Sequence, residues 1–316
     1  MQSETVITPK IEKYPNKPIT LIVPYSAGGG TDLVARTLEK QSIKYLGQPI
    51  TVVNKPGGSG TLGWNELAGA APDGYTLGMI SSDMLLPSLY DTTKYDYVTA
   101  LDPLAQISST PVVIAVRSDQ PWQNISDLIS YAKENPGKVK FGNAGVGSLP
   151  HIVGEMFAYY SGIKIEQVPF RGASESTAAL LGGHIQVAVA SQTTFNEYLK
   201  DGSIRILATT AKQRLSDPLW KQIPTFKEQG LNILFSNQFG IAAPKEMPVE
   251  VKNKLVEELK AMIADPEFQK DLVNMGLQVK YLSPDKTQKN WLSDSQELNQ
   301  AVQETGIIDL IQSQKQ

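Results

Sequence analysis

The chain has 316 residues, which is long enough for two domains at about 100–200 residues per domain. Hydrophobic residues make up 41% of the chain, enough for a sizeable core, and a net charge of −3 without a basic block argues against a nucleic-acid partner. There is no cysteine, which excludes disulfides, thiol catalysis and cysteine-based metal sites, and no apolar run approaches the ~18 residues of a membrane-spanning helix.

The N-terminal stretch MQSETVITPKIEKYPNKP is polar and lacks the basic and then apolar segments of a signal peptide. We expect residues 1–13 to be disordered or to be the remnant of a leader. Two interpretations stay open here. The protein is cytoplasmic, or it is a mature form in which an initiator Met replaces a removed leader.

Strands and helices are expected to alternate over the first third of the chain. ITLIV at 19–23 is a short run rich in β-branched residues, typical of a buried strand, and apolar residues at helical spacing predict a helix over 31–46. A strand at 50–53, a short helix at 63–70 and a strand at 75–80 follow. This alternation predicts an α/β fold with a mostly parallel sheet covered on both faces.

A second alternating series is expected after the strand PVVIAV, which ends at Arg117. Its helices are predicted at 126–134, 150–160, 174–181 and 194–200, and its strands at 138–142, 163–168, 185–189 and 204–208. An extended stretch follows at 233–244. From Pro248 onward the chain is expected to be almost wholly helical, with three helices.

This order of elements predicts two α/β lobes joined by two crossings of the chain, near 110–118 and 234–241. Residues 14–116 together with 238–316 would form the first lobe, and residues 117–237 the second. A cleft between two such lobes is a common ligand site.

Three consecutive glycines follow the first strand, in IVPYSAGGGTD (22–32). Glycine lets the backbone approach a ligand closely because it has no Cβ atom. The loop lies at the carboxyl end of a strand and leads into a helix N-terminus, where unpaired N–H groups and the helix dipole favour an anion. No P-loop lysine is present, so a carboxylate or single phosphate fits better than a nucleoside triphosphate. A tight strand-to-helix turn is the purely structural alternative.

The loop GNAGVGSLPH (142–151) repeats this arrangement in the second series. Gly145, Gly147 and Ser148 stand between a predicted strand and a helix that has Pro150 near its first turn. Two helix starts suited to an anion, one in each lobe, favour a shared ligand over two unrelated turns.

A third loop, GGSGTLG (57–63), matches the G-x-G-x-x-G spacing of dinucleotide-binding proteins through Gly58, Gly60 and Gly63. Asp83 lies at the distance expected for a ribose-binding acid, about 20 residues further on. However, loop residues separate the preceding strand from these glycines, and the helix after them is short. A structural loop is therefore favoured, and an NAD-dependent oxidoreductase using these residues is the alternative.

Candidates for catalysis are few. His151 is expected to pack or to cap a helix, and His184 is expected in a surface turn. No HExxH, GxSxG or spaced carboxylate pair occurs, so we expect no enzyme, no bound metal and no cofactor. Four aspartates are interpreted as turn and surface residues: Asp73, Asp83, Asp96 and Asp102.

Many motifs occur in a characteristic order along almost the whole chain. They are YPNKPITLIVPYSAGGGTDLVAR (14–36), LGQPITVVNKPGGSGTLG (46–63), PDGYTLG (72–78), PSLY (87–90), GSLPH (147–151), VPFRGASES (168–176), LLGGHIQVAVAS (180–191), LATT (207–210), IPTFKEQG (223–230) and GIAAP (240–244). This order closely resembles the substrate-binding receptors of tripartite tricarboxylate transporters, the TctC-like or Bug family.

The resemblance implies a two-lobed periplasmic-binding-protein fold with the ligand cleft between the lobes. It also implies a receptor outside the cytoplasmic membrane, free in the periplasm or lipid-anchored, that hands a small carboxylate to membrane permease subunits. In the family, loops matching 25–32 and 145–151 grip the carboxylate through backbone N–H groups and ordered water. Carried over to this chain, the first loop contributes Tyr25, Ser26, Ala27, Gly28, Gly29 and Thr31. The second loop contributes Gly145, Gly147 and Ser148 and is bordered by His151. The residues expected at the distal end of the ligand are Ser81, Ser82, Arg171, Ser191, Gln192 and Gln238.

Two departures from the family pattern bear on the ligand. Gln238 and Phe239 stand where many members have an aromatic pair, and Ser191 is neutral where members often have an acid. Without that acid nothing obvious pairs an ammonium group, so a dicarboxylate or monocarboxylate is favoured over an amino acid. Arg171 is the cation expected near a second carboxylate, with a surface salt bridge as the alternative.

We expect capture by hinge closure, with bending near 116–118 and 234–240 in a monomeric receptor. A sensor domain that binds the same ligand but reports to a signalling partner is a further alternative that the sequence does not separate from transport.

Overall fold

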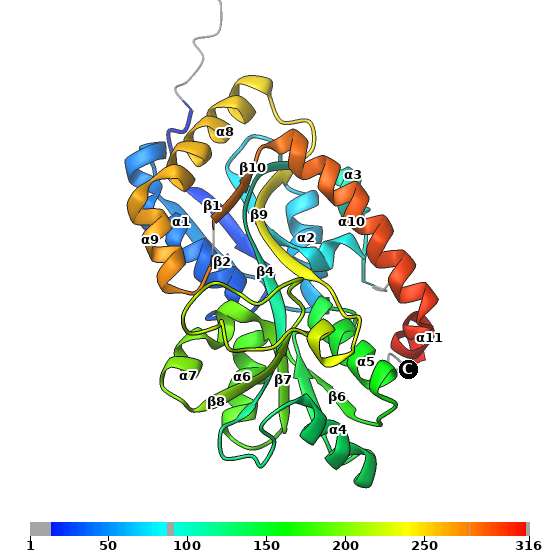
Figure 1. Ribbon diagram of the computed structural model, residues 1–316. Coiled ribbons are helices and arrows are strands. Elements are labelled where there is room, and N and C mark those ends of the chain that lie inside the picture. Colours follow the sequence, from blue (N-terminus) through cyan, green and yellow to red (C-terminus); the bar gives the residue numbers. More distant parts are fainter. Residues whose placement is uncertain (1–13, 87–91, 278, 314–316) are drawn as a thin grey trace, which may run out of the picture.

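The computed structural model describes residues 14–86, 92–277 and 279–313 (Figure 1). Its strands and helices gather into two groups, which lie one above the other in the figure. Residues 1–13, for which disorder or a leader remnant is expected, and the PSLY motif at 87–90 lie outside the described residues.

The upper group in Figure 1 begins with three parallel strands, in which β1 lies between β2 and β3. Its first elements are β1 (Ile19–Val23), α1 (Gly30–Leu46), β2 (Ile50–Asn54), α2 (Thr61–Ala68) and β3 (Thr76–Ser81). Leu21 of β1 and Val34 and Leu38 of α1 are fully buried in one hydrophobic cluster. The apolar spacing that predicted this strand and helix is therefore the spacing that packs α1 against the sheet.

The lower group repeats the plan, with β5 parallel to both β6 and β7. Its elements are α4 (Ile125–Glu134), β5 (Lys140–Asn143), α5 (Leu149–Ser161), β6 (Glu166–Pro169), α6 (Ala173–Leu181), β7 (Val187–Ser191), η4 (Gln192–Phe195), α7 (Asn196–Lys200) and β8 (Ile204–Thr209). Each predicted helix and strand of this series is confirmed, with ends that move by a few residues.

Two long strands connect the groups. β4 (Leu101–Arg117) and β9 (Ser236–Pro244) pair antiparallel from Leu101↔Pro244 to Pro111↔Ser236. Beyond that point β4 leaves β9 and pairs with β7 and β8 of the lower group. The strand order is β2-β1-β3-β9-β4-β7-β5-β6, so one curled sheet runs through both groups, and its parallel outer parts are joined by antiparallel strands. The two-lobed α/β fold is confirmed, although the sheet is more mixed than the sequence predicted.

The C-terminal segment differs from the prediction. It was expected to be almost wholly helical, but it also contains β10 (Val279–Leu282), which pairs antiparallel with β4. The short sequence VKYL is rich in residues that favour strands, and the exposed edge of β4 supplies its hydrogen bonds. The described helices of this segment are α8 (Val249–Ala264), α9 (Pro266–Asn274), α10 (Pro284–Glu304) and α11 (Ile307–Ser313), one more than predicted.

α10 begins beside the upper group and runs toward the lower group, where α11 meets α5 (Figure 1). One hydrophobic cluster contains Met156 and Phe157 of α5 together with Val302 of α10 and Ile307 of α11. The two groups therefore share apolar contacts on this side of the molecule. In the described part of the chain, no helix combines the length and apolarity needed to cross a membrane.

Candidate ligand-binding site

A cleft lies where the two groups meet, at the carboxyl ends of strands from both. This is where open α/β sheets place their ligands. Its lining residues are Tyr25, Gly29, Gly30, Thr31, Asp83, Ala144, Pro150, Ala173, Ser191, Thr194, Asn237 and Phe239.

The N-terminus of α1 forms one wall of the cleft. Gly29 is the N-cap residue, and it has no side chain that could cap the helix. The first hydrogen bond of the helix runs from the Leu33 N–H to the Gly29 carbonyl, so the N–H groups of the preceding turn have no partner within the helix. A Cβ atom on Gly30 would lie 3.2 Å from the Phe239 ring, so glycine allows the close approach of this turn to β9. The wall thus offers backbone donors and the positive end of a 17-residue helix.

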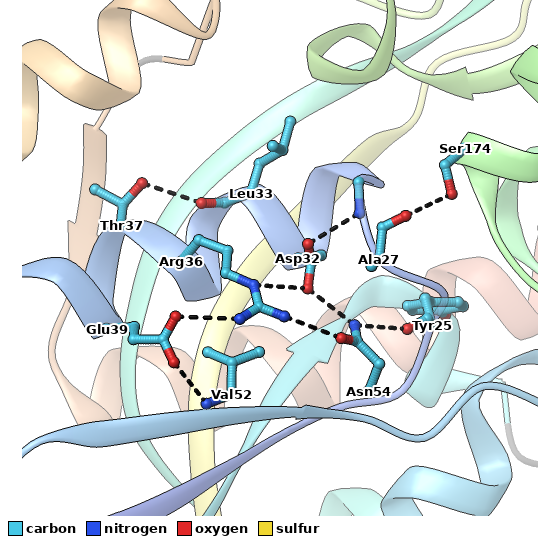
Figure 2. A network of polar contacts seen from close by, with 11 residues as sticks. Tyr25, Ala27, Asp32, Leu33, Arg36, Thr37, Glu39, Val52, Asn54 and Ser174 are labelled. Carbon is cyan, nitrogen blue, oxygen red and sulfur yellow. Dashed lines mark hydrogen bonds and ion pairs between the residues drawn. The ribbon is translucent and has the colours of Figure 1, made fainter.

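A buried carboxylate supports this turn from behind. Asp32 accepts a hydrogen bond of 2.9 Å from the Gly28 N–H, and it is held by Asn54 Nδ2 at 2.9 Å and by Arg36 Nε at 3.4 Å (Figure 2). The Gly28 N–H is therefore engaged within the protein. Ala27 and Gly28 are exposed and do not line the cleft, so of the three residues Ala27 to Gly29 only Gly29 does.

The same loop touches the second group of elements. Ser174 Oγ of α6 donates a hydrogen bond of 2.8 Å to the Ala27 carbonyl and lies 3.1 Å from Ser26 Oγ. Figure 2 shows Ser174 reaching Ala27 from a separate segment of the chain. A Cβ atom on Gly172 would lie 2.3 Å from Ser26 Oγ, so only glycine fits there. The 25–32 loop is therefore held from both sides of the cleft.

The N-terminus of α5 faces the cleft from the other side, but its donors are already bound. Ser148 is the N-cap residue and accepts from the His151 N–H. The Gly147 N–H donates to His151 Nδ1 at 2.9 Å, and the Gly145 N–H donates to Asn143 Oδ1 at 2.9 Å. Pro150, in the first turn, has no N–H group. The sequence predicted an anion-binding jaw here, and in the structure the protein's own groups take up these donors.

Asp83 accepts a hydrogen bond from a further N–H group at the start of α5. It stands in η2 (Ser82–Leu85), directly after β3, and its Oδ1 accepts a hydrogen bond of 2.8 Å from the Leu149 N–H of α5. The Tyr25 hydroxyl donates to its Oδ2. Burial raises the pKa of the Asp83 carboxyl to about 6, although the bonds from Tyr25 and Leu149 favour the charged form. The interpretation of Asp83 as a turn or surface residue is wrong, because its side chain is 2% exposed.

His151 is fully buried behind this helix start and does not line the cleft. Since Nδ1 accepts from Gly147, the proton of the neutral ring lies on Nε2, which faces Glu155 Oε1 at 3.3 Å. The expectation that His151 packs or caps rather than catalyses agrees with this position.

Three strand ends are joined beside the cleft by one amide. Asn237 Nδ2 donates to Ser191 Oγ at 2.9 Å, and Asn237 Oδ1 accepts from the Ser82 N–H at 3.1 Å. Ser82 Oγ in turn accepts from the Gln238 N–H at 3.0 Å. Ser191 lines the cleft, whereas Ser82 is buried and is not among the lining residues.

Four other expected site residues do not line the cleft. Ser81 Oγ lies 3.2 Å from the Tyr25 hydroxyl, Gln192 Nε2 donates to the Gly276 carbonyl at 3.3 Å, and Gln238 Nε2 donates to Asp294. Arg171 is exposed and is not among the lining residues. Its backbone N–H donates to Glu175, at the start of α6.

Two hydroxyls at the cleft were not expected from the sequence. Thr193 and Thr194 of η4 are at least nine-tenths buried, and their Oγ1 atoms have no hydrogen-bond partner. Thr194 lines the cleft, and the Thr193 Cβ lies 3.7 Å from where a Gly30 Cβ would stand. Buried hydroxyls normally have partners, so two orphans beside an uncapped helix start indicate room for an acceptor. Their position directly after β7 was the available sequence signal.

The loop at 57–63 has a structural role. Ser59 Oγ donates to the Val146 carbonyl across the cleft at 2.6 Å, and a Cβ atom on Gly63 would lie 2.9 Å from Pro24 Cα. Asp83, which the dinucleotide hypothesis needs on a ribose, is bound to Tyr25 and Leu149 instead. Among residues 14–86, 92–277 and 279–313, no cluster of His, Cys, Asp or Glu could hold a metal ion.

Comparisons with known proteins agree on one family. A protein-family model described as "Tripartite tricarboxylate transporter family receptor" matches residues 34–307. The periplasmic binding protein BugD is 31% identical, with 93% of this chain and 99% of that chain covered and a TM-score of 0.88. Two Rhodopseudomonas palustris structures are also similar. Rpa4515 with adipate is 26% identical (93% and 98% covered, TM-score 0.87), and MatC with bound malate is 25% identical (93% and 99% covered, TM-score 0.82).

Proposed function

Because the chain belongs to the tripartite tricarboxylate transporter receptor family, we propose that it is a periplasmic receptor that captures a small carboxylate and delivers it to membrane permease subunits. The single observation that carries the ligand class is the uncapped α1 N-terminus, which opens into the cleft beside the orphan hydroxyl of Thr194. Adipate and malate, which accompany two similar structures, belong to the same class of small carboxylates.

The grip that we propose is made mostly by the backbone. One carboxylate oxygen accepts hydrogen bonds from N–H groups in the first turn of α1, after Gly29. The other oxygen accepts a hydrogen bond from the hydroxyl of Thr194. Such bonds to a charged acceptor are stronger than neutral ones, and the helix dipole adds to them. No arginine fork is needed, and Asp32 keeps the turn in place from the side away from the cleft.

We further propose that residues 14–116 with 238–316 move as one lobe and residues 117–237 as the other. The hydrogen bonds that cross the cleft include Ser174 to Ala27, Ser59 to Val146 and Leu149 to Asp83, and they support a closed arrangement. Bending is expected near 116–118 and 234–240, close to where β4 leaves β9 and pairs with β7 and β8. A ligand that binds only the closed form shifts the population of the receptor toward that form. In this proposal the receptor is a monomer, and the permease recognises its closed form.

Thermal unfolding against a panel of small anions tests the proposal. A ligand at 100 times its Kd stabilises the native state by about 2.7 kcal/mol. At an unfolding entropy of about 2.1 cal/mol/K per residue, this raises the midpoint of a chain of this length by about 4 °C. The panel should contain C4–C6 acids with one or two carboxylates, citrate, aromatic acids, amino acids, phosphate and NAD. No shift with any carboxylate, or a shift with NAD alone, would overturn the receptor function.

Thr194→Val sharpens this test because it removes one orphan hydroxyl and keeps the shape of the side chain. We expect the free energy of unfolding without ligand to be equal to that of the wild type or higher, since no protein bond is lost and a buried hydroxyl without a partner is removed. Losing a bond to a charged group, about 1.5–3 kcal/mol, should weaken ligand binding by about 10- to 100-fold. Ser161→Ala is the matched control, because Ser161 Oγ of α5 is also buried without a partner but lies outside the cleft.

A further inference from the structure

Asp83 gives the cleft a charge that the sequence did not suggest. Among the described residues that line the cleft, Asp83 is the one acid, and none is a lysine or an arginine. Arg171, the cation expected near a second carboxylate, is exposed and outside the lining. The buried Asp32 nearby is already paired with Arg36. The cleft therefore contains no side-chain cation that would offset additional negative charge.

Asp83 also occupies the second anion-binding position. Its Oδ1 receives the Leu149 N–H at the start of α5, which is the position expected for a carboxylate of the ligand. The other donors of that helix start bind His151 and Asn143. The start of α6, where Gly172 provides no side-chain cap, also reaches the cleft at Ala173. Its backbone adjoins the α1 turn, since a Cβ atom on Gly29 would lie 4.0 Å from Ala173 N, so these two helix starts can serve the same carboxylate while the α5 start is occupied by Asp83.

From this arrangement we propose that Asp83 selects the charge of the ligand, so that the receptor takes a small acid with one carboxylate and a hydrogen-bond donor at its other end. The inference rests on the proposed carboxylate-receptor function and narrows its ligand class. The carboxylate binds at α1, and a hydroxyl or an ammonium group faces Asp83 and Tyr25.

The chemistry of a carboxylate supports this orientation. Each oxygen of the ionised Asp83 carboxylate can accept more than one hydrogen bond, so a donor on the ligand can share an oxygen with Tyr25 or Leu149. A second carboxylate on the ligand would face Asp83 without a cation between them, and two like charges repel strongly where water is excluded. The neutral Ser191 was the reason to disfavour an ammonium group, and the buried acid at Asp83 removes that reason.

Calorimetry with ligands of equal chain length tests the inference. Adipate, 6-hydroxyhexanoate, 6-aminohexanoate and hexanoate share a six-carbon chain and differ only at the far end, and succinate, 4-hydroxybutyrate and 4-aminobutyrate form a shorter set. We expect the wild type to bind the best hydroxy or amino acid at least tenfold more tightly than the dicarboxylate of the same length. The comparison of the hydroxy and amino acids distinguishes the two donors.

Asp83→Asn should reverse the preference, because the amide keeps the shape but removes the charge. We expect the dicarboxylate to gain at least tenfold relative to the hydroxy or amino acid. Asp294→Asn is the matched control, since it removes a half-buried acid of α10 outside the cleft, and its ligand preference should equal that of the wild type. Equal or tighter binding of the dicarboxylate by the wild type overturns the inference, whether or not the Asp83 variant folds. An unchanged ratio in a folded Asp83→Asn protein overturns it as well, whereas the receptor function fails only if no carboxylate binds.

Discussion

The starts of α1 and α5, which both face the cleft, differ in how their backbone donors are used. α1 begins with a glycine and without a side-chain cap, and its turn opens into the cleft. α5 begins with Ser148 as a cap, and His151, Asn143 and Asp83 take up the neighbouring N–H groups. Both turns are rich in glycine and connect a strand to a helix, so the sequence alone predicts an anion-binding site at each of them. The comparison shows that a helix start is open to a ligand only where the protein leaves its donors without partners.

The largest expected effect comes from blocking the open helix start. A Cβ atom on Gly29 would make only ordinary contacts, with the Ser26 carbonyl oxygen at 3.7 Å as its nearest neighbour, and the Gly29 backbone is in the extended region. Gly29→Leu should therefore fold but place its side chain over the donors of α1. We expect carboxylate binding to weaken more than about 1,000-fold, a loss of about 4 kcal/mol. Titration calorimetry measures this.

Gly29→Ala provides the graded comparison, because a single methyl group leaves much of the turn accessible. Its affinity should lie between those of the wild type and Gly29→Leu. Equal affinities in all three proteins would mean that the ligand does not bind at α1.

An effect of intermediate size is the pH dependence of stability that we expect from Asp83, which accepts a hydrogen bond at the start of α5. The folded-state pKa of Asp83, about 6, lies above its ordinary value of 3.8, so the folded protein binds the proton more tightly than the unfolded chain. Stability contributed by this group is therefore fully present below about pH 4 and is lost as the pH rises through about 6, by up to about 3 kcal/mol. Asp265, whose pKa the Lys44 and Tyr45 side chains lower, acts in the opposite direction at more acid pH.

The measurement is the difference in unfolding free energy between the wild type and Asp83→Asn at pH 4 to 7. Other groups, including Tyr25, His151 and Glu155 around this helix start, remain in both proteins and cancel to first order. The difference should change with pH in the direction given above. A constant difference would mean that Asp83 titrates as an ordinary exposed acid.

The smallest effect concerns the cap of α5. Ser148→Ala removes the side-chain acceptor of the His151 N–H and should lower the free energy of unfolding by about 1 kcal/mol. Carboxylate affinity should change less than threefold, because this helix start is bound internally. Denaturant unfolding and calorimetry on the same protein separate the two quantities. A large loss of affinity with little loss of stability would indicate that α5 contacts the ligand after all.

Local patterns predicted most of the fold, since the apolar spacing in β1 and α1 depends on neighbours in the sequence. β10 was missed because its four residues form a strand only where the edge of β4 offers partners. In the site, the glycine turns and Tyr25 could be predicted from their position after strands. The burial and bonding of Asp83 could not be predicted, because they depend on Leu149, which is 66 residues away in the sequence.

The hydrophobic cluster shared by α5, α10 and α11 has a consequence for the heat capacity of ligand binding. Hydrogen bonds cross the cleft, and apolar side chains also join α5 to the C-terminal helices on the side where α11 meets α5. If opening keeps this apolar seam buried, closing the cleft removes little apolar surface from water, and binding should change the heat capacity only slightly. A strongly negative value would mean instead that the C-terminal helices detach from α5 when the lobes open.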